Sequence, residues 1–162
     1  MADETNEMTF EREPEEAVEA ALCALLASVC TIEVEGALTP ASEGTVKSLS
    51  VDTFVSVVVD QQSQDMDFVG RRVPHTYRAQ IAVRYSCADD ENAAKFRDEC
   101  RRVRSALVSL TGDNCTNLGA DGFSCDAFVI DSTSTSFEGG ENPCNVKTYS
   151  ATLKGRVTTM EA

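Results

Sequence analysis

The sequence predicts an α+β fold, a two-layer sandwich in which two helices pack on one face of a mainly antiparallel four-stranded sheet. Two segments repeat apolar residues at helical spacing, and residues 76–86 alternate apolar and polar side chains strictly. Both kinds of element therefore offer one apolar face, which two packed layers bury. The predicted order is α-β-β-α-β-β. At 162 residues the chain predicts one α+β domain, residues 14–162, after an acidic flexible segment of residues 1–13.

The first predicted helix begins at Pro14, a residue that suits a first helical turn. Glu15 and Glu16 follow it and favour the positive end of the helix dipole. The apolar stripe then consists of Val18, Leu22, Leu25, Leu26 and Val29. Gly36 and Pro40 mark the loop that ends this segment.

Two strands are predicted next. Residues 51–60 are rich in valine, and their apolar residues occupy both alternating positions, so we expect a strand covered on both faces for part of its length. Residues 61–75 predict a polar connector. In residues 76–86 the side chains on one face are Tyr77, Ala79, Ile81, Val83 and Tyr85, which indicates one packed face and one wetter face.

The second predicted helix opens at Asp89 or Asp90 as N-cap and closes near Gly112. Its apolar stripe is Ala93, Phe96, Cys100, Val103, Leu107 and Leu110, and its polar face carries Lys95, Arg97, Asp98, Arg101, Arg102 and Arg104. Residues 123–131 and 146–158 predict the last two strands. The link between them is longer than a tight hairpin turn requires.

The net charge of −13 argues against a protein that grips DNA or RNA, because phosphate contacts need stripes of lysine and arginine. The charge also favours solubility. No stretch reaches the roughly 18 apolar residues of a membrane-spanning helix. The N-terminus is acidic and so unlike a secretory signal, and we expect the protein in the cytoplasm or in a particle assembled there.

No catalytic, cofactor or metal site is predicted, and we expect the protein not to be an enzyme. The sequence has no nucleophile elbow, phosphate-binding glycine loop or dinucleotide fingerprint. Its one histidine, His75, is interpreted as a surface or capping residue. No Cys-x-x-Cys pair occurs among the seven cysteines, which we expect to be reduced, the alternative being a disulfide among Cys115, Cys125 and Cys144.

Two groups of arginines are the candidate subunit-interface residues: Arg71, Arg72, Arg101, Arg102 and Arg104. In one interpretation they form a solvated face that balances nearby acids. In the other they contact the acidic surface of an identical neighbour, and head-to-tail contacts of this kind close rings. The sequence leaves both interpretations open.

The order of these elements and their residue patterns resemble those of a known protein family. The opening EEAVEAALCALLASV, the alternating TYRAQIAVRYS, the helix NAAKFRDECRRVRSALVSL and the late YSATLKGRV carry the likeness. Together they resemble the tail terminator, tail-completion and minor tail proteins of long-tailed bacteriophages and prophages. The similarity extends over roughly residues 14–158 and rests on no catalytic or binding motif.

The resemblance implies a structural virion protein, in the tail or the head–tail joint, that is assembled in the host cytoplasm. It implies a homo-oligomeric ring, commonly a hexamer, that caps the tail tube and contacts the tube protein and a neck or head-completion protein. DNA would pass through the ring without specific binding. The connector would then supply a projecting or lumen loop, with Asp65, Asp67 and Phe68 as its candidate residues.

Three alternatives stay open from the sequence. A neck or head-closure connector subunit shares the same traits. A small ferredoxin-like binding module or enzyme would place His75, Asp121 and Asp126 around a pocket for an unknown ligand. An inhibitor or adaptor that mimics DNA would use carboxylates spaced along one exposed face.

Overall fold

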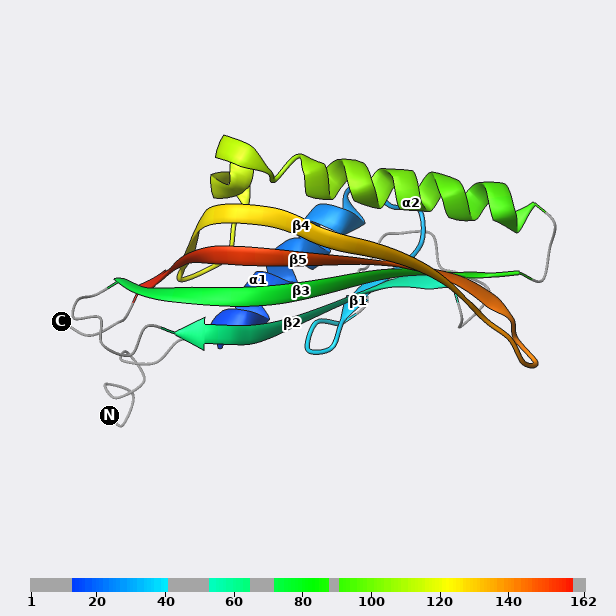
Figure 1. Cartoon of the computed structure of the whole chain (residues 1–162), viewed down its shortest axis with the longest axis horizontal. Coiled ribbons are helices and arrows are strands. Elements are labelled where there is room, and N and C mark those ends of the chain that lie inside the picture. Colours follow the sequence, from blue (N-terminus) through cyan, green and yellow to red (C-terminus); the bar gives the residue numbers. More distant parts are fainter. Residues whose placement is uncertain (1–12, 41–52, 65–71, 88–90, 159–162) are drawn as a thin grey trace.

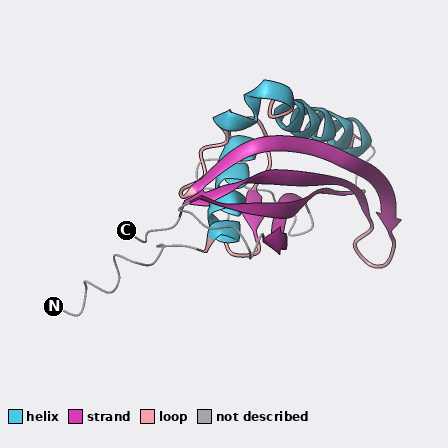
Figure 2. Ribbon diagram, turned by 60° about the vertical axis from the view of Figure 1, so that its left-hand side comes forward, coloured by secondary structure: helices cyan, strands magenta, loops and turns pink. Residues whose placement is uncertain are grey.

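A five-stranded sheet carries two helices on one of its faces (Figures 1 and 2). The computed structural model describes residues 13–40, 53–64, 72–87 and 91–158. The elements are α1 (Pro14–Ala27), β1 (Val34–Gly36), β2 (Phe54–Gln64), β3 (Arg72–Ser86), α2 (Asn92–Val108), the 3-10 helix η2 (Gly112–Asn117), β4 (Phe123–Glu138) and β5 (Cys144–Thr158). The α+β class is confirmed.

The predicted four-stranded sheet is wrong by one strand. The spatial order is β1-β2-β3-β5-β4, and β1 pairs in parallel with Val55 to Val57 of β2. Three residues are too few to show a two-residue period, so β1 has no signal in the sequence. Its first residue, Val34, is fully buried, and β1 packs against α1. The chain order is therefore α-β-β-β-α-β-β.

β4 and β5 form a long antiparallel hairpin, which corrects the prediction of a loose link after residue 131. They pair from Phe123 with Val157 to Glu138 with Cys144, and residues 139–143 make the turn. In the second half of β4 every side chain from Asp131 to Glu138 is exposed. A strand that is wet on both faces has no reason to alternate apolar and polar residues, and its Ser-Thr composition looks like a loop.

The predicted connector of residues 61–75 is shorter than expected. β2 continues to Gln64 and β3 begins at Arg72, and the two strands pair through Gln64 and His75. The polar residues Gln61 and Gln62 near the end of β2 are exposed. Residues 65–71 lie outside the described part of the chain, and so do Asp89 and Asp90.

The core fills the space between the helices and the facing side of the sheet. Odd-numbered residues of β2, β3 and β5 point towards the helices, as strand alternation requires. The fully buried members are Val18, Leu22 and Leu26 of α1, Val55 and Val57 of β2, Tyr77, Ala79, Ile81 and Val83 of β3, Val103 and Leu107 of α2, and Ala151 and Leu153 of β5. Ala93, expected in the apolar stripe of α2, is exposed.

The opposite face of the sheet carries no helix. On this face Val58 of β2 is 38% exposed, whereas Phe54 is half-buried with Arg84 over its ring. The prediction that this strand is covered on both faces for part of its length therefore fails at Val58 and agrees with the partial cover at Phe54. Arg84 crosses the open face to Glu138, with Nη1 2.8 Å from Oε2. This ion pair joins β3 to the far end of β4 across β5 and so steadies the hairpin.

Two buried carboxylates fasten the loop between α1 and β2. Glu19 of α1 accepts hydrogen bonds at 2.8 Å from the amide of Leu38 and from the hydroxyl of Thr39. Glu99 of α2 accepts a bond from the amide of Thr31 at 3.2 Å, and the Thr31 hydroxyl also donates to it. Both carboxylates thereby have the partners that burial requires. Among the described helices, none has the length and apolar character to span a bilayer.

Candidate functional site

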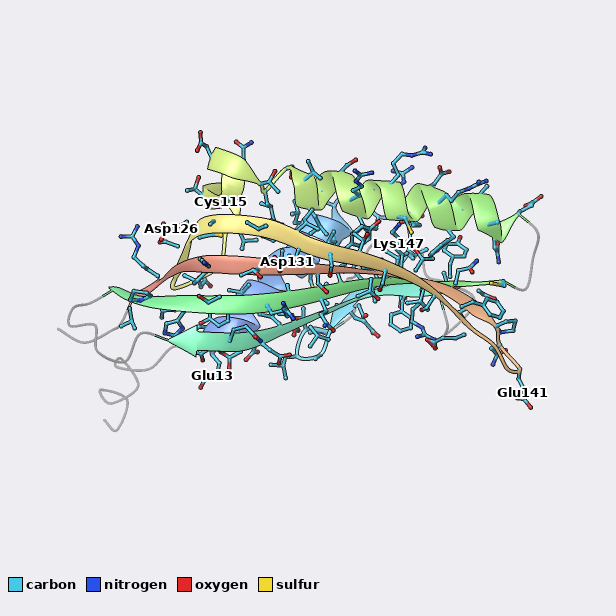
Figure 3. All side chains as sticks on the ribbon, viewed as in Figure 1. Glu13, Cys115, Asp126, Asp131, Glu141 and Lys147 are labelled. Atoms are coloured by element: carbon cyan, nitrogen blue, oxygen red, sulfur yellow. The ribbon has the colours of Figure 1, made fainter. Side chains whose placement is uncertain are left out.

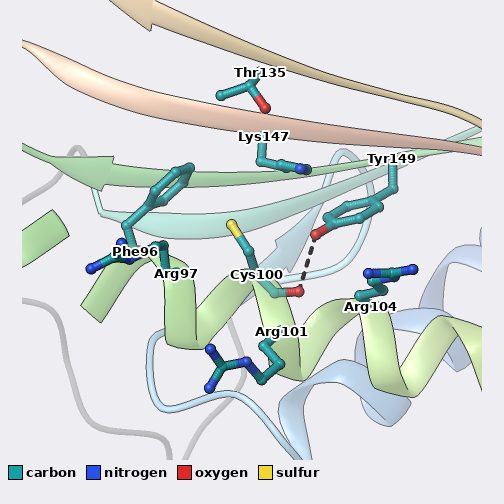
Figure 4. A pocket seen from close by; sticks show the side chains of 8 residues that line it. All are labelled: Phe96, Arg97, Cys100, Arg101, Arg104, Thr135, Lys147 and Tyr149. Atoms are coloured by element: carbon teal, nitrogen blue, oxygen red, sulfur yellow. Dashed lines mark hydrogen bonds between the residues drawn. The ribbon is translucent and has the colours of Figure 1, made fainter. Parts of the chain in front are cut away.

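A groove runs between α2 and the β4–β5 hairpin (Figure 4). It consists of two adjoining hollows of about 410 and 370 Å³, which share Arg104, Lys147 and Tyr149 as lining residues. The floor of the first hollow is formed by Phe96, Cys100 and Tyr149. We call this feature the α2–β5 groove.

One rim of the groove is a row of arginines on α2. Arg97, Arg101 and Arg104 line it, and their spacing of four and three residues puts them on one side of a helix. The neighbouring row, Phe96, Cys100 and Val103, is buried against the sheet. The burial of that row fixes the rotation of α2 and therefore holds the arginines along the groove.

The other rim is formed by Thr135 of β4 and Lys147 of β5, which lie opposite each other in the hairpin. Lys147 holds its ammonium nitrogen 5.9 Å from the ring centroid of Tyr149, a cation–π distance. The Tyr149 hydroxyl donates a 3.0 Å hydrogen bond to the backbone carbonyl of Cys100. Burial raises the pKa of Tyr149 to about 12, with Cys100 adding to the rise, so the floor stays neutral.

The groove concentrates positive charge in a strongly acidic chain. Within the described residues Arg97, Arg104 and Lys147 form no ion pair, and Arg101 lies 3.4 Å from Asp98 with both side chains largely exposed. An exposed pair of this kind contributes little. The formal charge of the whole chain is −13. The groove is therefore suited to an anionic group that the described residues do not supply.

The structure separates the arginines that the sequence grouped as interface candidates. Arg101 and Arg104 line the groove, whereas Arg102 points towards α1 and donates a 3.4 Å bond to the Val29 carbonyl. Arg72 begins β3 opposite Thr158, away from α2. Arg71 lies outside the described residues, as do the loop candidates Asp65, Asp67 and Phe68.

Sequence reasoning missed two members of the groove. Arg97 was placed on the polar face of the helix, and its spacing to Arg101 and Arg104 was the available signal. Lys147 is two residues from Tyr149 in the alternation of β5, which is a signal for a shared face. Only the fold brings Lys147 beside α2, because it lies 43 positions after Arg104 in the sequence.

The pocket of the enzyme alternative is not assembled. His75 is buried in β3, and its Nδ1 lies 2.6 Å from the Tyr77 hydroxyl, so its interpretation as a surface residue is wrong. Asp126 of β4 forms an ion pair with Arg156, with both contacts at 3.1 Å. Asp121 is an exposed loop residue next to η2. Each of the three side chains has a separate environment.

The cysteines form no disulfide, and all seven lie in the described part of the chain. Cys115 and Cys125 are neighbours, with the Cys115 thiol 3.5 Å from the Cys125 carbonyl. Burial, assisted by Cys115, raises the pKa of Cys125 to about 12. Cys144 lies at the far end of the hairpin opposite Glu138, so the three cysteines of the disulfide alternative do not come together.

A further hollow of about 470 Å³ lies where α1 meets the end of α2 and η2. Leu25, Leu110, Asn114 and Leu118 line part of it. The described residues that line it include no titratable side chain, so they offer no acid–base chemistry there. Among the described residues, no three histidine, cysteine or acidic side chains are grouped to hold a metal ion.

No protein-family model matches the sequence, and no curated protein matches it. Among solved structures, the chain is similar to one chain of a "Virion of native gene transfer agent (GTA) particle". That similarity has 14% sequence identity and a TM-score of 0.46, and it covers 89% of this chain and 93% of the other. At these values the likeness is coarse and carries no functional argument.

Proposed function

We propose that this chain is a structural subunit of a phage-type virion that assembles with copies of itself into a ring, acting as a tail terminator that caps the tail tube. The observation that carries the proposal is the α2–β5 groove. It holds Arg97, Arg104 and Lys147, for which the described part of the chain offers no ion pair, in a chain of net charge −13. The sequence resemblance to tail terminator proteins supplies the place of such a ring in a virion.

Self-association explains a basic groove in an acidic chain better than nucleic-acid binding does. A DNA-binding surface needs many phosphate contacts, and the like charge of the rest of the chain would repel a duplex. When copies of the chain associate, in contrast, each copy can place its carboxylates against the basic groove of the next. A basic groove on one copy and an acidic surface on the next make an unlike pair, and such head-to-tail contacts generate rings when the rotation closes.

The outer partners follow from this role. A ring at the end of a tail would contact the tube protein on one side and a neck or head-completion protein on the other. DNA would pass through the lumen without specific binding, since an acidic lining repels it. A neck or head-closure connector made of the same subunits is the alternative that keeps the groove contact and changes only the neighbours.

The proposal is tested by the solution mass of the purified chain, measured by light scattering over a range of protein concentrations, with negative-stain images of the same samples. We expect rings with a mass near six times the 17.5 kDa of one chain, as the resemblance implies. Rings that bind purified tail tubes and stop their growth would identify a terminator. Rings that bind only filled heads would identify the connector instead.

A further inference from the structure

We propose that the α2–β5 groove and the adjacent edge of β4 receive the acidic N-terminal segment, residues 1–12, of a second copy of this chain. The segment would add to the sheet as an extended strand and lay its carboxylates over the groove cations. The inference rests on the proposed self-association and names the two surfaces that meet.

The first support is the open edge of the sheet. β4 is the outermost strand and has only β5 beside it among the described strands. From Ser132 to Phe137 its side chains are all exposed, and Phe137 is 64% exposed. An edge of this length presents a row of backbone donors and acceptors, which is the template for strand addition by another chain. The side of this edge that faces α2 carries Thr135, a lining residue of the groove.

The second support is charge and pattern in the segment. It contains Asp3, Glu4, Glu7 and Glu11 against Arg12 as its one basic side chain. Glu7, Thr9 and Glu11 alternate with Met8 and Phe10, and this two-residue period puts both glutamates on one face of a strand. A strand added to β4 would direct that face to Arg97, Arg101, Arg104 and Lys147. The apolar face would lie on the open side of the sheet.

The third support is the position where the segment enters the fold. α1 packs mainly on β2 and β1. Burial raises the pKa of the Tyr77 hydroxyl in β3, and Glu15 and Glu13 lie close enough to add to the rise. Figure 3 places Glu13, the residue that follows the segment, towards one end of the molecule and Lys147 towards the other. Val83, which pairs with Lys147, lies six positions after Tyr77 in β3, or ~20 Å along the strand, and the segment would have to run back along that length to reach its own groove. Delivery to a neighbour is a head-to-tail contact, as a ring requires.

Photochemical cross-linking in the full-length chain tests the inference. Phe10 is replaced by p-benzoylphenylalanine, and this chain is mixed with isotopically heavy wild-type chain so that links between copies differ in mass from links within one copy. We expect links between copies, mapped by mass spectrometry to the open face of β4 around Ser134, because Phe10 would lie on that side of the added strand. Circular dichroism of the substituted chain checks that the fold is retained.

A charge variant shows whether the cations hold the segment. Arg97→Glu/Arg104→Glu in the heavy partner is expected to lower the yield of these links about tenfold, as loss of close charge pairs does. Lys95→Glu/Lys154→Glu changes the net charge equally at exposed sites outside the groove, and it is expected to leave the yield within about twofold.

The outcomes separate the inference from the proposed function. Links that form only within one copy, or that map to another surface, overturn the inference. If the sample is still a ring by light scattering, self-association stands and only its contact is reassigned. A monomer with no links between copies overturns both proposals.

Discussion

The Tyr149 hydroxyl donates a 3.0 Å hydrogen bond to the backbone carbonyl of Cys100, and this bond ties β5 to the middle of α2 under the groove (Figure 4). Tyr149 is 2% exposed. A buried hydroxyl that lost this partner would carry the cost of its desolvation. The bond therefore holds the two rims of the groove in register.

Tyr149→Phe is expected to lower the free energy of unfolding by about 0.5–1.5 kcal/mol, the usual net value of one hydrogen bond. Urea denaturation followed by circular dichroism measures the change. Tyr85→Phe is the matched control, because no hydrogen bond of the Tyr85 hydroxyl is found among the described residues. An equal loss in both variants would contradict the importance of the Tyr149 bond.

Gly36→Ala is expected to destabilise the fold by about 1–3 kcal/mol, the cost of leaving a buried polar group without its partner. A Cβ at this position would overlap the Glu19 carboxylate, which holds Leu38 and Thr39. Thermal unfolding of the variant measures the effect. Gly119→Ala is the control, since a Cβ there meets nothing within 4 Å, and its midpoint should not move.

Stability is expected to fall as the pH drops below the ordinary histidine pKa of 6.5. Burial lowers the pKa of His75 in the folded chain, so below pH 6.5 the unfolded chain binds a proton that the folded chain does not. The stabilisation is complete above that pH and is lost as the pH falls through it. Urea midpoints between about pH 7.5 and 5.5 test this, with His75→Asn as the comparison. The variant should show a flatter profile, and an unchanged slope would refute the assignment to His75.

Thiol reactivity should distinguish Cys87 from the buried cysteines. Burial raises the pKa of Cys23 and of Cys30 to about 12, whereas Cys87 is half-buried at the end of β3. Since the thiolate is the reactive form, iodoacetamide should alkylate Cys87 first in the native chain. Peptide mapping after short exposures measures the order. Early alkylation of Cys23 or Cys30 would show that the core opens readily.

The sequence was sufficient to predict those elements whose apolar residues recur at a regular period. The apolar stripe of α1 and the alternation around Ile81 predicted elements that the structure contains. The sequence did not predict the strands in segments where burial imposes no regular period on the residues. β1 has three residues, and Ser132 to Ser136 are wet on both faces of the hairpin, so neither segment shows a period.

The candidate site was predictable only in part, for a related reason. Arg101 and Arg104 stood out as charges on a helix, and periodicity could also place Arg97 beside them. Lys147 joins them because β5 lies between β3 and β4 in the sheet. Strand order depends on pairing between distant segments, and no local pattern in one sequence encodes it. The same pairing carried His75 into a buried position that its neighbours Pro74 and Thr76 do not suggest.

The central claim, that the α2–β5 groove holds copies of this chain together, is tested most directly by light scattering of wild type beside Arg97→Glu/Arg104→Glu and the control Lys95→Glu/Lys154→Glu. At low salt we expect a discrete multiple of 17.5 kDa for wild type and control, and the mass of one chain for the groove variant. Raising the salt to about 1 M, where the screening length is about 3 Å, should dissociate wild type as well. A wild type that stays at the mass of one chain, or a groove variant with an unchanged multiple, would contradict it.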